Sequence, residues 1–343
     1  MISHKLKVGI AGFGVVGQKR RKYIDENPSL ELIAVSDIKY TEDGSLPDGV
    51  HYYNDYKKLV REELDILFVS LPNNLAADAT ILGLENNCHV FCEKPPARNI
   101  KELNKVIAVE KKSPSIKLKY GFNHRYHQSV KKSKEIIDSK ILGEVISFRG
   151  VYGKSSIVPF GTGWRSNKEM AGGGILLDQG IHMLDMVRYF AKDFDEIYSF
   201  ISNDFWKHDV EDNAFILMRN DLGQIASLHS TATQWQHRFR LEIILKEGML
   251  ELAGILSGSK SYGSETLKII ERVEGESVGS QQEKTYTFLN DNSWKDEIDE
   301  FADCIVKNRP IANGTSYDAL KVMEMIFNVY QADKTWWETF KNN

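Results

Sequence analysis

Residues able to move protons occur in two short motifs of the chain. Lys94 stands in Glu93-Lys94-Pro95-Pro96, and Asp178 and His182 follow the glycine run Gly172-Gly173-Gly174. Residues four apart on a helix share a face, so the Asp178 carboxylate can orient the His182 imidazole and fix which nitrogen carries its proton. A positioned amine and imidazole suit general acid–base chemistry on a hydroxyl or carbonyl group.

Both motifs also have an ordinary structural interpretation. Lys94 alone could be a solvated or ion-paired lysine. Asp178 and His182 could form an ion pair on a helix surface, with Asp185 continuing the same stripe. However, two prolines fix the turn after Lys94, and a glycine run lets a backbone or a ligand approach closely. These flanking residues favour the functional interpretation.

A glycine-rich turn precedes both motifs. It reads Gly12-Phe13-Gly14-Val15-Val16-Gly17, follows the first apolar run of the chain, and is followed by a second run that ends in Ser36-Asp37. One G-x-G-x-x-G alone is weak evidence. A preceding strand, a following helix and an acid about 20 residues further on together form a dinucleotide-binding fingerprint.

Each residue of this fingerprint has a physical role. Gly12 permits the tight turn, Gly14 lets the backbone approach a pyrophosphate, and Gly17 allows close contact between helix and strand. The N-terminus of the helix offers unpaired N–H groups to the anion. Asp37 would bind the adenosine ribose and repel a 2′-phosphate, which favours NAD over NADP, although Lys39 would soften that preference.

The elements that must position these residues divide the chain into two halves. Up to about residue 122, short apolar runs alternate with helical stretches, which predicts a doubly wound parallel sheet. Strands are expected at residues 6–11, 30–36, 66–71, 89–92 and 116–121, and helices at 14–27, 76–85 and 100–111. We therefore expect an α/β Rossmann domain at residues 1–122.

Beyond residue 126 the pattern changes to alternating strands joined by tight turns, which predicts a large, mostly antiparallel open sheet. Strands are expected at residues 144–152, 196–201, 215–219, 224–230, 240–245, 249–252, 266–271 and 284–288, with one helix near 174–190. The expected second domain is an α+β domain at residues 123–343 for substrate binding and oligomerisation.

Two apolar stripes predict helices near the C-terminus, and these helices could pack back on the first domain. The first stripe is Ile298, Phe301 and Ile305. The second is Leu320, Met323, Phe327 and Tyr330, in a helix that we expect to begin with a cap at Ser316.

The composition limits the classes of binding partner and the cellular compartment that we expect for this protein. Lysine and arginine number 44 against 48 acidic residues, so no basic field favours nucleic acid or anionic lipid. Cys88, Cys92 and Cys304 are too few for a disulfide framework and have no histidine at a zinc spacing, so packing thiols in a reducing compartment are expected. No apolar span approaches bilayer length. We expect a cytoplasmic protein with small-molecule ligands and no metal.

Several motifs in order resemble the Gfo/Idh/MocA oxidoreductase family, which includes glucose-fructose oxidoreductase and inositol dehydrogenases. They are the glycine turn, Glu93-Lys94-Pro95, Gly121-Phe122-Asn123-His124-Arg125-Tyr126, Trp164-Arg165, and Gly172-Gly173-Gly174 leading to Asp178 and His182. The resemblance spans nearly the whole chain. It implies a Rossmann domain, a C-terminal domain whose open sheet forms oligomer contacts, and hydride exchange between a nicotinamide and a carbinol carbon of a sugar, nucleotide sugar or cyclitol.

The resemblance also implies residue roles. The catalytic lysine is Lys94, the helix acid Asp178 and the histidine His182; either Lys94 or His182 removes the hydroxyl proton in oxidation, and the same group protonates the alkoxide in reduction. Cofactor contacts are expected from Gly12, Phe13, Gly14, Val15, Val16, Gly17, Asp37, Ser70, Leu71, Pro72, Asn73, Glu93, Lys94, Asn123, Trp164 and Arg165. Substrate contacts are expected from Lys94, Arg125, Tyr126, Asp178 and His182.

Further pocket candidates mix aromatic faces with hydrogen-bond donors, as sugar sites do. They are His127, Trp235, Gln236 and His237, of which the last three could equally form an oligomer edge. One departure from the family is Ala76, which stands where many relatives have histidine.

Three classes of function stay open, because a fold alone does not assign one. The first is an NAD-dependent dehydrogenase or ketoreductase, expected as a homodimer or homotetramer through the C-terminal sheet. The others are a glycoside hydrolase that retains NAD and a regulator that senses dinucleotide without catalysis. The presence of both Lys94 and His182 favours the first class.

Overall fold

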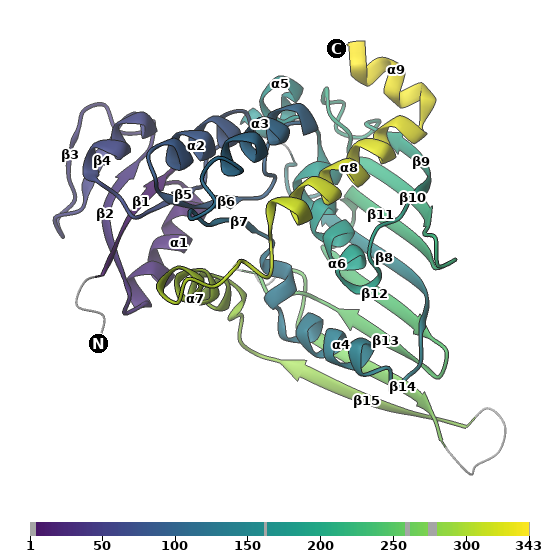
Figure 1. Cartoon of the computed structure of the whole chain (residues 1–343). Coiled ribbons are helices and arrows are strands. Elements are labelled where there is room, and N and C mark those ends of the chain that lie inside the picture. Colours follow the sequence, from purple (N-terminus) through teal and green to yellow (C-terminus); the bar gives the residue numbers. More distant parts are fainter. Residues whose placement is uncertain (1–4, 161–162, 258–260, 274–279, 343) are drawn as a thin grey trace. The chain divides into compact units, whose positions relative to one another are not determined.

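The computed structural model describes residues 5–160, 163–257, 261–273 and 280–342. The chain forms two compact units, each built on its own sheet (Figure 1). The first unit ends at Asn123 and adds the later segment Trp294–Leu320. The second unit takes His124–Ser293 and the chain from Lys321 onward.

Within the described residues, the sheet of the first unit has seven strands in the order β3-β4-β2-β1-β5-β6-β7. They are β1 (Leu6–Ala11), β2 (Leu30–Ser36), β3 (Gly44–Ser45), β4 (His51–Tyr53), β5 (Ile66–Val69), β6 (His89–Glu93) and β7 (Leu118–Gly121). The central strands β2, β1, β5, β6 and β7 pair in parallel. Their carboxyl ends therefore share one edge, where open parallel sheets bind ligands.

Helices cover both faces of this sheet. One face carries α1 (Val15–Glu26) and α7 (Ser293–Val306), and the other carries α2 (Asn73–Glu85) and α3 (Ile100–Glu110) (Figure 1). A 3-10 helix, η1, spans Tyr56–Glu62. On the α7 side, Phe301 meets the rings of Phe68 and Phe91 edge-on, with centroids 6.2 and 5.6 Å apart. The predicted stripe of α7 is therefore the part of this helix that closes the apolar core.

The sheet of the second unit has eight strands among the described residues, in the order β15-β14-β13-β12-β8-β11-β10-β9. They are β8 (Val145–Ser155), β9 (Glu196–Ser202), β10 (Asn213–Arg219), β11 (Ile225–Gln234), β12 (Arg238–Leu245), β13 (Gly248–Ala253), β14 (Glu265–Arg272) and β15 (Gln281–Phe288). In the part of that sheet that the structure describes, only β8 and β11 are paired in parallel. The predicted fold class, a parallel Rossmann sheet and a large, mostly antiparallel one, is confirmed.

One face of this second sheet is covered by helices. They include α4 (Gln128–Ser139) and α6 (Ile181–Ala191) (Figure 1). A π-helical turn, η4 (Leu176–Gly180), precedes α6 and contacts β11. Burial alternates along the strands, as the two-residue period of a strand requires. The opposite face consequently presents a second set of side chains, several of them large and apolar.

The remaining helical elements among the described residues are either short or lie in the C-terminal part of the chain. They are η2 (Asn123–Tyr126), η3 (Gly163–Ser166), α5 (Lys168–Ala171), α8 (Ser316–Ala332) and α9 (Lys334–Asn342). The cap predicted at Ser316 is wrong: Ser316 is the first helical residue, and Thr315 is the cap. The Thr315 hydroxyl accepts from Asp318 N at 3.1 Å, and the Asp318 carboxylate accepts from Thr315 N at 3.1 Å. This reciprocal pair is a capping box.

Across the part of the chain that the structure describes, none of the helices has the length and apolar character needed to cross a membrane.

Candidate active site

The three glycines of the first turn meet three different surroundings. A Cβ on Gly12, whose φ is +91°, would lie 2.4 Å from the carbonyl oxygen of Ser70. A Cβ on Gly17 would lie 2.1 Å from the carbonyl oxygen of Gly12. At Gly14 the same atom would meet nothing within 4 Å. Gly12 and Gly17 are thus required by packing, whereas Gly14 leaves an open approach to the backbone.

This edge of the sheet fits a dinucleotide. Gly14 is the N-cap of α1 and makes no side-chain cap bond, so the first amides of the helix have no acceptor from that cap. The Ser36 and Ser70 hydroxyls, at the ends of β2 and β5, are buried and have no hydrogen-bond partner among the described residues. Open amides at a helix N-terminus bind phosphate oxygens, and unsatisfied hydroxyls can bond to a ligand.

Asp37 and Lys39 lie on the turn after β2. The backbone N–H of Lys39 donates to Asp37 Oδ1 at 3.0 Å, and the Lys39 ammonium donates to the carbonyl oxygen of Phe13 at 2.9 Å. The acid expected to bind ribose therefore lies beside a lysine that reaches the glycine turn. The turn after β2 thus carries one negative and one positive charge, and its contact with the ribose of NAD or the 2′-phosphate of NADP stays a prediction.

The next two strands also end at this edge. After β5, the segment Ser70-Leu71-Pro72-Asn73 leads into α2, whose N-cap is Pro72. Ala76, at the position where relatives have histidine, is 3% exposed and packs inside α2. After β6 comes Lys94, which is joined to Pro95 by a cis peptide bond.

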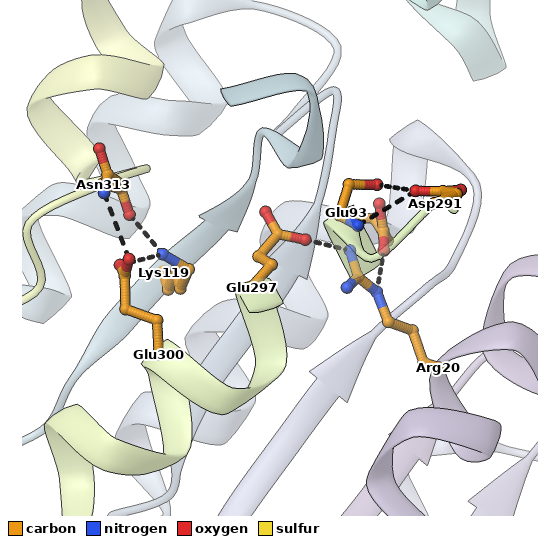
Figure 2. Close-up of polar contacts among 8 residues, drawn as sticks. Arg20, Glu93, Lys119, Asp291, Glu297, Glu300 and Asn313 are labelled. Carbon is orange, nitrogen blue, oxygen red and sulfur yellow. Dashed lines mark hydrogen bonds and ion pairs between the residues drawn. The ribbon is translucent and has the colours of Figure 1, made fainter. Parts of the chain in front are cut away.

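Glu93, directly before Lys94, is held by a buried arginine (Figure 2). Arg20 of α1 donates from Nε to Glu93 Oε1 at 2.6 Å and from Nη2 to Glu297 Oε2 on α7 at 2.8 Å. On the same helix Glu300 accepts from Lys119 of β7 at 2.9 Å. Burial raises the pKa of Glu297 to about 7, although the Arg20 and Lys119 charges oppose the rise. The end of β6 is thereby tied to α1 and α7.

In the second unit, His182 lies in a buried aromatic and polar cluster. Its imidazole stacks on that of His124, with ring centroids 3.7 Å apart and 15° between the planes. His124 Nε2 is 3.0 Å from the hydroxyl of Tyr152 on β8. Burial raises the pKa of Tyr152 well above its usual value. The phenol therefore stays protonated at neutral pH and can only donate or accept hydrogen bonds.

Asp178 and Gln179 border the same cluster from the π-helical turn. Asp178 is partly exposed, and Arg165 Nε lies 3.9 Å from its carboxylate. Gln179 Nε2 donates to the hydroxyl of Tyr262 at 2.8 Å. Burial raises the pKa of Tyr262 to about 12, so this phenol is also neutral.

His237 continues the aromatic surface. Its ring stacks on Tyr262 with centroids 4.8 Å apart. The N–H of Ser155 donates to His237 Nδ1 at 2.7 Å, so in the neutral ring Nε2 carries the proton. Burial and the charge of Lys154 lower the pKa of His237, which favours that neutral form. His237 thus offers one N–H donor.

Arg125, Tyr126 and His127 are buried beside this cluster. The Arg125 guanidinium donates to both oxygens of Asp185 at 2.8 and 2.6 Å. His127 Nδ1 lies 2.8 Å from the Glu265 carboxylate. Arg125 thereby fixes α6, the helix of His182, while the predicted contact of Arg125 and Tyr126 with substrate stays a prediction.

Of the remaining predicted residues, Arg165 lies with its guanidinium 4.3 Å from the Trp164 ring centroid. Trp235 is 80% exposed at the end of β11 and next to Gln236. Lys94 and the glycine turn belong to the first unit, whereas Asp178, His182, Trp164 and Arg165 belong to the second.

Within the described residues, no three His, Cys, Asp or Glu side chains are grouped so that they could hold a metal ion.

The sequence did not predict most of the aromatic residues around His182, among them Tyr152, Tyr262 and the stacking of His124. Tyr152 occupies an inward position of β8, where a core residue is the default expectation. Tyr262 lies outside any helix or strand, so no periodicity marks it. His124 stood within a quoted motif, but nothing in its spacing indicated that it would stack on His182.

Comparison with known families gives two matches in chain order. Residues 6–122 match the family model described as "Oxidoreductase family, NAD-binding Rossmann fold". Residues 130–251 match the model described as "GFO/IDH/MocA C-terminal domain". Together the two matches cover more than half of the chain.

Named relatives match over shorter stretches. D-glucoside 3-dehydrogenase of Escherichia coli K12 is 33% identical over 55% of this chain and 55% of its own length. Inositol 2-dehydrogenase of Salmonella typhimurium LT2 is 31% identical over 45% of this chain and 48% of its own length. The chain thus spans about half the length of the curated relatives it matches.

A solved structure extends the likeness to nearly the whole fold. Levoglucosan dehydrogenase in complex with NADH and levoglucosan covers 97% of this chain and 98% of its own, with a TM-score of 0.81 at 19% identity. At that identity the match establishes the fold alone. With both domain models matched in order on this fold, the chain belongs to the Gfo/Idh/MocA family of oxidoreductases, and its residues 6–122 form an NAD-binding Rossmann domain.

Proposed function

We propose that this protein is an NAD-dependent oxidoreductase that exchanges a hydride between nicotinamide and a carbinol or keto carbon of a sugar, nucleotide sugar or cyclitol. One observation carries the proposal. In a chain with an NAD-binding domain, a buried imidazole, His182, and a partly exposed carboxylate, Asp178, lie on one helical segment among neutral hydrogen-bonding groups. Acid–base groups beside a polar, uncharged surface suit the oxidation of a polyol.

The proposed division of labour follows from the chemistry of each side chain. Bound nicotinamide supplies the hydride acceptor or donor. Lys94 or His182 takes the hydroxyl proton in oxidation and returns it to the oxygen in reduction. Asp178 orients the reacting group by accepting a hydrogen bond, and Arg165 Nε lies 3.9 Å from its carboxylate.

The neutral donors and acceptors support the substrate class. Tyr152 and Tyr262 stay protonated, and His237 stays neutral with its proton on Nε2, so these three side chains exchange hydrogen bonds without adding charge. The named relatives, a glucoside dehydrogenase and an inositol dehydrogenase, support the same class.

The test is a substrate panel. Methyl glucosides, myo-inositol, scyllo-inositol, levoglucosan and nucleotide sugars are incubated with NAD or NADP, and the reduced nicotinamide is followed by absorbance. For the active compound we expect Lys94→Ala and His182→Asn each to lower kcat about 100-fold or more, as loss of an acid–base group does. The exposed Lys105→Ala on α3 is the matched control and should retain activity.

Two results would contradict this proposal. One is the absence of NAD-linked turnover with every compound of the panel. The other is turnover that survives both Lys94→Ala and His182→Asn, because the two candidate proton acceptors would then have no part in the reaction. The pH profiles of the two variants in the oxidation direction identify the first proton acceptor: the variant that lacks it no longer shows the fall of kcat/KM at low pH that protonation of the base causes.

We also propose that the enzyme is a homo-oligomer through the open face of the second sheet. Large apolar side chains lie exposed on neighbouring strands of that face: Tyr198, Phe200, Phe215, Leu217 and Ile225. Burial lowers the pKa of His229, which stacks on Phe215 at 3.8 Å, to about 4, so this imidazole is uncharged. A continuous apolar patch on one face is typical of an interface between copies.

The assembly is tested by mass measurement in solution. Phe200→Glu with Phe215→Glu should convert the oligomer into a monomer in analytical ultracentrifugation, while Leu222→Glu, an exposed residue of the 220–223 turn, serves as the control. A wild-type chain that sediments as a monomer would contradict the proposal.

We infer a cytoplasmic location from the cysteines. Cys88, Cys92 and Cys304 are buried free thiols, the usual form in a reducing compartment. Fractionation of cells that express the tagged protein tests this, and recovery in a membrane or secreted fraction would contradict it.

A further inference from the structure

Glu211 binds three successive backbone amides at the start of the segment that carries Asp178 and His182. Its carboxylate accepts from Gly174 N at 2.8 Å and from Leu176 N at 2.9 Å. Its own carbonyl oxygen accepts from Ile175 N at 3.0 Å. The side chain is completely buried, and the Tyr330 hydroxyl donates to the same carboxylate at 2.8 Å. Glu211 therefore satisfies the amides that every helix leaves without an internal partner.

The glycine run makes this contact possible. A Cβ on Gly174 would lie 2.0 Å from the carbonyl oxygen of Glu211 and 2.9 Å from its nitrogen. A Cβ on Gly173 would lie 2.3 Å from the hydroxyl of Tyr330. Gly174 therefore permits a close approach between two parts of the backbone, and Gly173 makes room for the Tyr330 side chain. Larger residues here would push the segment away from Glu211.

The segment begins with an unusual turn that needs such a hold. Leu176–Gly180 is π-helical, Asp178 lies within it, and α6 with His182 follows directly. The residue before the turn, Ile175, makes no side-chain cap bond of its own. π-Helical turns are rare, and the extra residue in the turn changes the direction of every side chain in it. The relative direction of Asp178 and His182 thus depends on where the turn starts.

Burying a carboxylate at the start of this helical segment is energetically unfavourable. Burial raises the pKa of Glu211 to about 7, even though the amides and the Tyr330 hydroxyl favour its charged form. Helices usually begin with a local Ser, Thr, Asp or Asn at their surface. A distant and wholly buried acid that binds two amides with its two oxygens fixes both the start and the direction of the helix. That is more than helix stability alone requires.

We propose that Glu211 is a positioning residue for the reaction, which fixes the segment 174–182 so that Asp178 and His182 point at the substrate. The inference rests on the proposed function, because it gives Glu211 a part in the same hydride transfer. Glu211 touches backbone amides and Tyr330 in the structure, so it acts through the two residues that it orients.

The test compares Glu211→Ala, Glu211→Gln and Tyr330→Phe. Tyr330→Phe is the matched control, because it removes one hydrogen bond from the same carboxylate and leaves the three amide bonds in place. Two readouts are taken: hydrogen exchange of the amides in residues 174–182, and kcat, KM and the Kd of NAD. The exchange experiment needs no substrate and therefore stands without the proposed activity.

We expect Glu211→Ala to raise amide exchange in 174–182 about tenfold or more, and kcat to fall about 100-fold, the effect of displacing catalytic groups by about 1 Å. The Kd of NAD should stay within about twofold, because the amides that Glu211 binds lie outside the first unit. Glu211→Gln should have a higher kcat than Glu211→Ala, because the side-chain carbonyl oxygen of glutamine can still accept a hydrogen bond from one of the two backbone amides. Tyr330→Phe should lower the melting temperature yet keep kcat within about twofold.

The inference would be overturned if Glu211→Ala left the amide hydrogen exchange of residues 174–182 unchanged. It would also be overturned if Glu211→Ala and Tyr330→Phe lost the same stability and Glu211→Ala lowered kcat no more than Tyr330→Phe. If Glu211→Ala does not fold, the comparison of Glu211→Gln with Tyr330→Phe decides by the same criteria. A wild-type enzyme without NAD-linked turnover would instead contradict the proposed function, and exchange in 174–182 would still show whether Glu211 holds the segment.

Discussion

Replacing Glu297 by glutamine should change how the stability of the protein depends on pH. Glu297 is completely buried, accepts from Arg20 at 2.8 Å through Oε2, and leaves Oε1 without a hydrogen-bond partner among the described residues (Figure 2). Burial raises its pKa from 4.5 to about 7 against the Arg20 and Lys119 charges, and Glu93 adds to the rise. The glutamine keeps the shape of the side chain and removes its titration.

The sign and size of the effect follow from this pKa. Because the folded protein binds the proton more tightly than the unfolded chain, Glu297 contributes stability that is complete below pH 4.5 and is lost as the pH rises through 7. The difference between the two pKa values corresponds to about 3 kcal/mol. Glu211 also has a pKa of about 7, but it is present in both proteins and cancels in the comparison.

The assay is urea unfolding of the wild type and Glu297→Gln at several pH values between 4.5 and 8. From the lower to the higher pH, the free energy of unfolding of the wild type should fall by about 3 kcal/mol more than that of the variant. Asp296→Asn on the same helix is the control for a simple change of charge. Parallel curves for the wild type and Glu297→Gln would refute the reasoning, because Glu297 would then titrate alike in the folded and unfolded chain.

Three further predictions rest on single features of the first unit. Gly17→Ala should destabilise the protein by about 2 kcal/mol or more in thermal unfolding, because its Cβ would meet the Gly12 carbonyl oxygen at 2.1 Å. Gly14→Ala, whose Cβ would meet nothing within 4 Å, should keep the melting temperature and weaken NAD binding about tenfold in calorimetry. Equal melting temperatures for the two variants would contradict this prediction. Asp37→Ser should shift the ratio of the Kd values of NADP and NAD toward NADP about tenfold, since it removes the repulsion of a 2′-phosphate beside Lys39, and an unchanged ratio would count against the role of Asp37. Burial raises the pKa of Cys92 to about 12 and that of Cys88 to about 11, so neither thiol should react with a disulfide reagent at pH 8 until urea unfolds the chain; rapid labelling of the native protein would argue against their burial.

The sequence predicted the first sheet well because buried parallel strands are nearly continuous apolar runs. β1 and β2 have the predicted bounds, and β6 differs by one residue. The edge strands β3 and β4 were missed, since strands of two and three residues show no periodicity. In the second sheet the turn at 220–223 is confirmed by a hydrogen bond of 3.0 Å from Gly223 N to the Asn220 carbonyl oxygen.

The candidate site was predictable only where function imposes a spacing. The glycine turn has a fixed spacing, so separate roles could be predicted for Gly12, Gly14 and Gly17. The surroundings of Gly12 and Gly17 are as crowded as those roles require, whereas the contact of Gly14 with a pyrophosphate stays a prediction. The hold of Glu211 on Gly174 joins residues 37 positions apart, and no local pattern reports such a contact. The same limit applies to the helix cap, where the choice of Thr315 over Ser316 depends on the pairing with Asp318.

The assignment of Trp294–Leu320 to the first unit has a consequence for the order in which the protein is made. On the ribosome, the strands of the NAD-binding domain emerge before those of the second sheet, but Phe301, which covers Phe68 and Phe91, emerges only after them. A nascent chain stalled after residue 123 would therefore expose the rings of Phe68 and Phe91 to chaperones, and expression of that fragment alone should yield aggregates.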